Sequence, residues 1–237
     1  MTPDEASIDR AALAARYREV TAAIETAARD AGREPDELTT IVVTKFHPAA
    51  LVAALAGLGQ RAMGESRQQE FVPKAEALRD LGLDWHFIGQ LQSNKAARVV
   101  EHAATIHSLD RESLLTALVA TQQSVSAFIQ VNLTDDPARG GVPPAALPAF
   151  VERVLEAPTI RLQGLMGVAA LDGDPRASFA RLRELRDEVV TPRARAATGL
   201  SMGMSGDFAA AIAEGATHLR IGTAITGKRP AGAYART

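Results

Sequence analysis

Two kinds of hydrophobic pattern alternate along this chain. The first is a short run of apolar and β-branched residues, most clearly at residues 38–45, where Thr, Ile and Val follow one another without polar alternation. Such a run is typical of a strand buried on both faces of a parallel sheet. The second is a longer segment in which apolar residues recur every three or four positions, beginning with Leu13, Tyr17, Val20 and Ile24. That spacing predicts an amphipathic helix ahead of the first strand.

The same alternation continues along the chain and predicts eight strands, most of them followed by a helix-start signal. The expected strands are residues 38–45, 61–64, 84–89, 104–108, 126–133, 160–166, 198–201 and 217–222. The expected helix-start residues are Thr2, Pro48, Ser66, Asp110, Pro143, Asp174 and Ser205, chosen as capping residues or first-turn prolines.

This order of elements defines the expected fold class. Eight strands alternating with helices, without a linker or a break in composition, indicate an α/β protein built as one (β/α)8 TIM barrel. We expect a single domain over residues 1–227, with an extra N-terminal helix. Residues 228–237 are rich in Gly, Ala and Arg, and we expect them to form a flexible tail.

Composition and charge narrow the classes of partner. Of 237 residues, 46% are hydrophobic and only 4% aromatic, and the net charge is −2 without any basic block. We therefore expect binding to neither nucleic acid nor an anionic membrane. The chain has no cysteine, which excludes disulfides, thiolate metal sites and a catalytic thiol. Residues 1–9 do not form a signal peptide and the longest apolar run, residues 49–58, is too short to span a bilayer, so we expect a cytoplasmic protein.

Lys45 is the first candidate for chemistry. It closes the first strand, and Pro48 starts the next helix, so the lysine is expected at the carboxyl end of a buried strand, where α/β barrels bind ligands. A partly desolvated amine there has a lowered pKa and can act as a nucleophile or form a Schiff base. On position alone, a lysine that extends into water is the more common case. Other residues at the same end of the barrel are needed to distinguish a reactive lysine from a solvent-exposed one.

The loops after the seventh and eighth strands supply that information. They read Ser-Met-Gly-Met-Ser at residues 201–205 and Arg-Ile-Gly-Thr at residues 220–223. Hydroxyls, glycines that allow close backbone approach and an arginine are the groups that an oxyanion requires, and barrels commonly bind phosphate at this place. A Schiff-base lysine and a phosphate-binding loop at one end of a barrel are the equipment for pyridoxal 5′-phosphate (PLP).

Six separated motifs, in the right order, resemble those of the pyridoxal phosphate homeostasis proteins, single-domain relatives of the barrel of bacterial alanine racemase. The resemblance extends over residues 13–227. The motifs are Val-Thr-Lys at residues 43–45, Gly-Glu-Ser at 64–66, residues 85–95, Gly-Leu-Met at 164–166, and residues 200–205 and 220–225.

The resemblance implies a fold-type III PLP barrel in which Lys45 carries PLP as an internal aldimine. It further implies that Ser201, Gly222 and Thr223 bind the phosphate and that Arg220 faces the pyridine nitrogen. Ser66 stands where the family usually has a longer asparagine. The cofactor-binding residues expected from the resemblance are Lys45, Ser66, Met166, Ser201, Met202, Arg220, Gly222 and Thr223.

The small number of tyrosines bears on whether the protein is an enzyme. PLP-dependent racemisation needs acid–base groups on both faces of the cofactor, and in alanine racemase the second is a tyrosine from another domain. This chain has only Tyr17 and Tyr234 and no second domain. We therefore expect a carrier or regulator of PLP without catalytic residues, with PLP-dependent apoenzymes as candidate recipients. A racemase-like enzyme is the first alternative.

A metal-dependent barrel hydrolase is the second alternative. His86, His107, Glu65 and Asp110 lie on or near the ends of expected strands, and all four could ligate a metal. The sequence has no His-x-His pair or other tight ligand spacing, which favours packed or hydrogen-bonded histidines. No metal is therefore expected.

Overall fold

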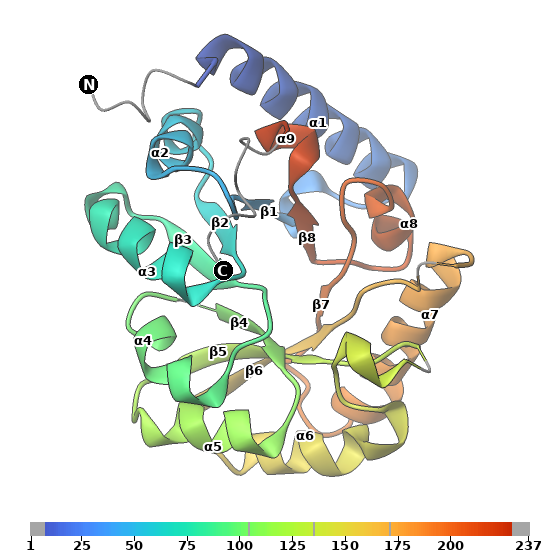
Figure 1. The fold of residues 1–237 in the computed structure, drawn as a ribbon. Helices are drawn as coiled ribbons and strands as arrows, with labels where there is room; N and C mark the ends of the chain where they lie inside the picture. Colours follow the sequence, from blue (N-terminus) through green and yellow to red (C-terminus); the bar gives the residue numbers. More distant parts are fainter. Residues whose placement is uncertain (1–7, 104, 135, 171, 229–237) are drawn as a thin grey trace.

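The strands form a closed parallel barrel. The computed structural model describes residues 8–103, 105–134, 136–170 and 172–228. The eight strands pair in the order in which they occur in the chain, β1 closing on β8, and Figure 1 shows them at the centre of the molecule with helices around them. The strands are β1 (Thr39–Val43), β2 (Ala62–Glu65), β3 (Asp84–Phe87), β4 (Thr105–Leu109), β5 (Val125–Gln130), β6 (Ile160–Met166), β7 (Gly199–Ser201) and β8 (His218–Ile221). The expected (β/α)8 barrel is confirmed.

Helices follow the strands and cover the outside of the barrel. They are α1 (Arg10–Asp30), α2 (Ala49–Gly57), α3 (Gln68–Ala77), α4 (Ala96–Val100), α5 (Glu112–Ala120), α6 (Leu147–Leu155), α7 (Pro175–Leu185), α8 (Phe208–Ala213) and α9 (Thr223–Thr226). The extra helix α1 lies beside α8 and α9 (Figure 1), next to the place where the barrel closes. Among the described residues, none of these helices is long and apolar enough to cross a membrane.

Helix starts agree with the sequence at some positions and differ at others. Asp174 caps α7 as expected, its side chain accepting a hydrogen bond from Arg176 N at 2.9 Å. The N-cap residues of α3, α5 and α8 lie one or two positions later than expected. They are Arg67, Arg111 and Asp207 in place of Ser66, Asp110 and Ser205.

At α3 and α5 the shift arises because the chain needs extended residues to turn from the barrel onto its outer face. Arg67 and Arg111 are themselves extended, and Asp110 forms an ion pair with Arg111 instead of a cap. The expected start at Thr2 lies outside the described residues. Within them, Asp9 caps α1 by accepting from Ala12 N at 2.9 Å.

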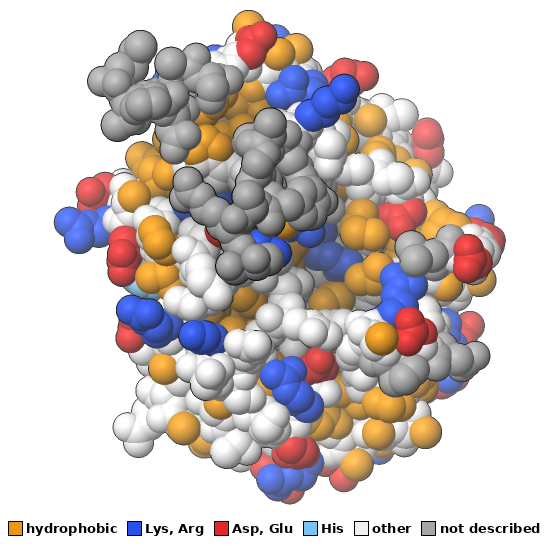
Figure 2. Space-filling model, in the orientation of Figure 1, with side chains coloured by type: hydrophobic (Ala, Val, Ile, Leu, Met, Phe, Trp, Pro, Cys, Tyr) orange, Lys and Arg blue, Asp and Glu red, His pale blue; other side chains and the backbone are white. Residues whose placement is uncertain are grey.

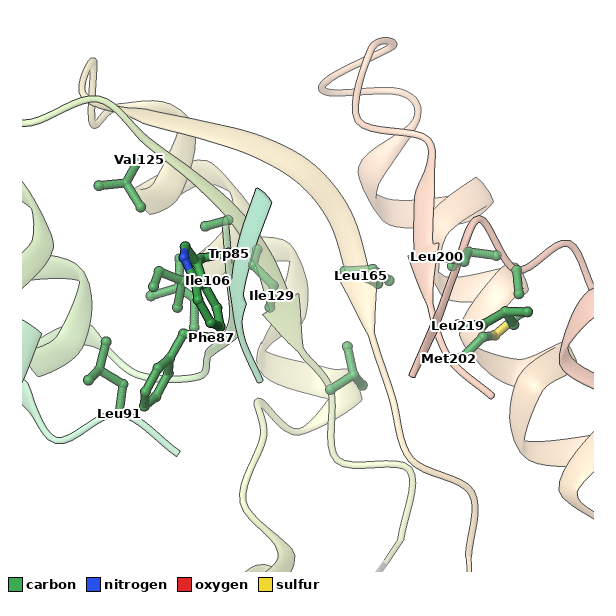
Figure 3. Packing of buried hydrophobic residues seen from close by; sticks show 14 of the residues in the cluster. Trp85, Phe87, Leu91, Ile106, Val125, Ile129, Leu165, Leu200, Met202 and Leu219 are labelled. Carbon is green, nitrogen blue, oxygen red and sulfur yellow. The ribbon is translucent and has the colours of Figure 1, made fainter. Parts of the chain in front are cut away.

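Alternate residues of each strand face opposite sides of the sheet, and the outward set forms the main hydrophobic core. This layer between strands and helices is one continuous cluster of buried side chains, part of which is shown in Figure 3. It includes fully buried Phe87, Ile106, Leu165 and Leu219. Burying one such side chain stabilises a fold by about 1.5–3 kcal/mol, so this layer holds the helices on the barrel.

The inward set is more polar and contains stacked rings. His107 stacks on Phe128 with 4.7 Å between ring centroids, and His218 meets Phe128 edge-on at 4.9 Å. His86 Nδ1 lies 2.9 Å from His107 Nε2 within hydrogen-bond distance. Burial lowers the pKa of all three histidines, to about 3 for His86, to about 4 for His218 and well below the usual value for His107. They are therefore neutral near pH 7 and fill the barrel as hydrogen-bonding aromatic rings.

Gly164 lets β6 approach β7 closely. Its φ is +146°, and a Cβ at this position would lie 1.9 Å from the carbonyl oxygen of Gly199. The β5–β6 register also shifts nearby, between Ala127 and Phe128. A side chain at residue 164 would therefore open the barrel next to the seventh strand.

The lowered histidine pKa values predict that the fold is acid-sensitive. Below about pH 6.5 the unfolded chain binds protons that folded His86, His107 and His218 do not bind, so the free energy of unfolding decreases as pH falls. Each of these histidines contributes up to about 1.4 kcal/mol per pH unit. Urea unfolding at about pH 7, pH 6 and pH 5 measures this slope.

Glu65 has the opposite effect on the pH dependence of the free energy of unfolding. Burial raises the pKa of Glu65, so as pH falls this carboxyl takes up its proton earlier in the folded chain than in the unfolded chain and opposes the slope, by at most the effect of one of the three histidines. The variant His218→Gln should reduce the slope. Stability that is constant from about pH 7 to pH 5 would contradict the assignment of neutral, buried histidines.

Candidate functional site

Lys45 lies directly beyond the carboxyl end of β1. Val43 pairs with Gly64 of β2, and Thr44 N donates to Gly64 O at 2.9 Å, so the parallel register continues past the strand end. Half-buried Lys45 follows Thr44, and Ser66 follows Glu65, the last residue of the adjacent strand β2. Two of the expected site residues thus lie just beyond the carboxyl ends of neighbouring strands, at the mouth of the barrel.

The turn after β8 lies on the other side of Lys45. Ile41 pairs with Arg220, and a Cβ added to Gly222 would lie 3.7 Å from the Cβ of Val43. Gly222 caps the short helix α9, whose first residue, Thr223, is exposed. Because the first N–H groups of a helix have no partner within it, this turn offers backbone donors and a hydroxyl at the mouth.

Arg220 and Ser201 join β8 to β7 below that turn. The Arg220 guanidinium donates to Ser201 Oγ at 2.8 Å, to Ser201 O at 2.6 Å and to Gly167 O at 2.9 Å. Both side chains are buried. Burial lowers the pKa of Arg220 to about 10, against the opposing field of Asp207. A cation held here by uncharged oxygens favours an anion close by.

His107 also belongs to this network, although the sequence suggested it only as a metal ligand or as a packed or hydrogen-bonded strand residue. Its Nδ1 lies 2.8 Å from Ser201 Oγ, and its Nε2 faces His86. The hydroxyl of Ser201 is therefore held from two sides, by His107 and by Arg220. The available signal was strand periodicity, because His107 follows outward-facing Ile106 and must point into the barrel.

The two methionines of the expected set lie in different places. Met166 ends β6 next to Gly167, the acceptor for Arg220, and is 3% exposed. Met202 instead packs with Leu200 and Leu219 in the outer core, as Figure 3 shows. Its N–H donates to His218 O at 3.1 Å. The side chain of Met202 is thus not grouped with the others, and its role in binding stays a prediction.

A close backbone contact supports Ser66 at the mouth. A Cβ on Gly89 would lie 2.2 Å from the carbonyl oxygen of Ser66, so only glycine fits here. Figure 2 shows Lys and Arg side chains in the hollow at the centre of this face. The arrangement combines an amine, hydroxyls and a buried cation, a donor set that fits a phosphorylated aldehyde.

The residues considered for a metal do not converge. His86 and His107 face the barrel interior and hydrogen-bond each other, whereas Glu65 forms an ion pair with Lys74 at 2.6 Å on the outer side of the sheet. No group of three or more potential metal ligands occurs among the residues that the structure describes. The hydrogen-bonded role considered for both histidines is confirmed.

Comparison with known proteins agrees with this geometry. The family model of the alanine racemase N-terminal domain matches residues 8–230. The pyridoxal phosphate homeostasis protein of Pseudomonas aeruginosa is 40% identical over 230 residues, covering 94% of this chain and 98% of that protein. The protein of the same name in Escherichia coli K12 is 38% identical over 230 residues, covering 92% of this chain and 97% of its own length.

Solved structures show the same architecture. PipY of Synechococcus elongatus PCC7942, solved with PLP bound, has a TM-score of 0.79 and 35% identity, covering 91% of this chain and all of its own. Alanine racemase of Corynebacterium glutamicum has a TM-score of 0.67 at 17% identity, with 94% of this chain and 62% of that chain covered, which shows a shared fold. This chain belongs to the alanine racemase N-terminal domain family and, within it, to the pyridoxal phosphate homeostasis proteins.

Proposed function

We propose that this protein binds PLP covalently through Lys45 and acts in PLP homeostasis as a carrier or regulator. The observation that carries the proposal is the position of Lys45 at the barrel mouth, beside a turn whose neighbour Arg220 is a buried cation hydrogen-bonded to Ser201. The names of the relatives and the PLP bound to PipY support the same cofactor. Its cytoplasmic location is part of the proposal and rests on the cysteine-free sequence.

Each residue of the site has a distinct part in binding. The amine of Lys45 condenses with the aldehyde carbon of PLP; a C=N bond forms and one water molecule is released. Ser201, Thr223 and the backbone of Gly222 would hold the phosphate, while Ser66 and Met166 would border the ring. When bound, PLP supplies a ring that can accept electrons from an attached amino compound.

Arg220 would determine how strongly that ring withdraws electrons. A guanidinium stays protonated and offers only donors, so a ring nitrogen facing it stays unprotonated. An unprotonated ring is a weaker electron sink, which suits storage of the cofactor better than carbanion chemistry. This part of the proposal rests on the buried position of Arg220.

The position of Tyr17 favours a carrier over a racemase. Its hydroxyl donates to Gln60 Oε1 at 3.3 Å, and Gln60 in turn donates to Thr40 O and Ala62 O, near the amino ends of β1 and β2. That is the end of the barrel opposite to Lys45. Tyr234 lies outside the described residues. Among those described, no tyrosine is placed to serve as the second acid–base group.

The first experiment is the near-visible absorption spectrum of the purified protein, before and after borohydride reduction. We expect an imine band that is lost on reduction, with the pyridoxyl group mapped to Lys45. The variant Lys45→Ala should fold but lack the covalent bond, whereas Lys95→Ala should retain it. A protein that stays colourless after incubation with PLP would refute the proposal.

Loss of a phosphate ligand should weaken retention without preventing covalent attachment. A hydrogen bond to a charged group contributes about 1.5–3 kcal/mol, so Ser201→Ala and Thr223→Ala should each raise the PLP dissociation rate by roughly tenfold or more. Dialysis after loading, followed by absorbance, measures this rate. Thr121→Ala removes a hydroxyl at the end of α5 and serves as the control. Equal rates in all proteins would rule out the proposed phosphate ligands.

A carrier should also deliver its cofactor. Mixed with a purified PLP-dependent apoenzyme, the loaded protein is expected to restore that enzyme's activity, and the borohydride-reduced protein is not, because its C–N bond can no longer hydrolyse. Racemisation of amino acids by the loaded protein should not exceed that of free PLP. Strong racemisation would favour the racemase-like alternative.

A further inference from the structure

Charged side chains behind the barrel wall hold the two peptide units on either side of Lys45. They belong to β2 and to α3, which follows it. We propose that Glu65, Glu70 and Lys74 are positioning residues that aim the amine of Lys45 into the barrel mouth. This inference rests on the proposed function, because it concerns the same covalent site.

Lys74 holds the peptide unit before Lys45. Its Nζ donates to the carbonyl oxygen of Thr44 at 3.0 Å and to Glu65 Oε1 at 2.6 Å. Thr44 Oγ1 donates to the same carboxylate oxygen at 2.7 Å. Glu65 is fully buried and Lys74 is 9% exposed. Both the backbone and the side chain of Thr44 are thus fixed by one ion pair.

Glu70 holds the peptide unit after Lys45. Its Oε2 accepts a hydrogen bond from Phe46 N at 2.7 Å. Phe46 has a φ of +68°, a left-handed conformation that is unfavourable for a bulky residue. The guanidinium of Arg67 lies 4.9 Å from the centre of the Phe46 ring and adds a cation–π contact. The turn immediately after Lys45 is therefore imposed on the chain from α3.

The helix that bears Glu70 and Lys74 is itself firmly anchored. Phe71 is fully buried, with its ring centroid 5.4 Å from that of Trp85 and 5.9 Å from that of Phe87. Glu70 lies in the first turn of α3, where the helix dipole favours a carboxylate. A rigid helix can define the direction of Lys45 because both flanking peptide units are tied to it.

The position of the Glu65–Lys74 ion pair indicates that it orients the backbone at Lys45 and does not mainly stabilise the fold. Burying two charges costs desolvation energy that a salt bridge often fails to recover. Glu65 Oε2 is buried and has no hydrogen-bond partner in the described part of the chain. An apolar pair would fill the same space with less desolvation, but it could not hold the Thr44 carbonyl. The two charges therefore serve to hold the backbone at the point where the chain passes from β1 to Lys45.

The test compares how fast Lys45 reacts with two reagents in the PLP-free protein. One is PLP, followed by absorbance; the other is trinitrobenzenesulfonate, a small amine reagent with no need for the barrel mouth, followed by peptide mapping at Lys45. In Glu70→Ala we expect the rate with PLP to fall about tenfold relative to the rate with trinitrobenzenesulfonate. Glu70→Gln keeps an acceptor oxygen for Phe46 N and should restore most of the rate.

Two further variants complete the design. Glu76→Ala removes an exposed acid from the same helix and should behave as wild type. Glu65→Gln/Lys74→Met removes both buried charges together, which avoids leaving one unpaired. It should lower the rate at which Lys45 reacts with PLP as Glu70→Ala does. Wild-type protein in which PLP does not attach to Lys45 refutes the proposed function. Attachment at equal rates in wild type, Glu70→Ala and the double variant refutes the positioning role alone.

Discussion

The closed parallel barrel imposes one constraint on which the rest of the structure depends: each strand residue must face either the interior or the helices. Residues one position apart therefore serve different purposes. Ile106 packs under the helices, whereas His107 enters the barrel and holds Ser201. Glu65 and Thr44 face α3, whereas Lys45 follows the inward set to the mouth. The site lies on the inner face of these strand ends, and the Glu65–Lys74–Thr44 network lies on their outer face.

This division places a cation where water is scarce. Arg220 is buried among uncharged oxygens and the neutral histidines of the barrel interior. In such surroundings an electrostatic interaction is stronger than at the surface. A phosphorylated ligand at the mouth would meet a fixed positive charge that needs no rearrangement. Membership of the pyridoxal phosphate homeostasis proteins fits that arrangement.

The fold could be predicted largely from the sequence because eight short strand patterns alternate with helix patterns at regular spacing. Even the short β7 was located within a residue or so, since Gly199 and Ser201 lie between strong helix signals. Helix starts at Ser66, Asp110 and Ser205 were misplaced, because a polar residue near a strand end resembles a cap whether or not the chain has turned. The contacts of Arg220 could not be predicted, because they join residues far apart in sequence through the register of the closed barrel. Those of Lys74 depend on how α3 packs against β2, which the sequence pattern does not specify.

The burial of Lys74 has a consequence for chemical selectivity. The sequence contains four lysines, and its other side chains that are cationic near neutral pH are arginines, which stay protonated there and are poor nucleophiles. One of the four amines, that of Lys74, is enclosed with Glu65 and Thr44. A protein that stores a reactive aldehyde in this way presents few competing amines to it. If this chain carries such an aldehyde, as proposed above, its own surface would thereby be protected from adventitious modification.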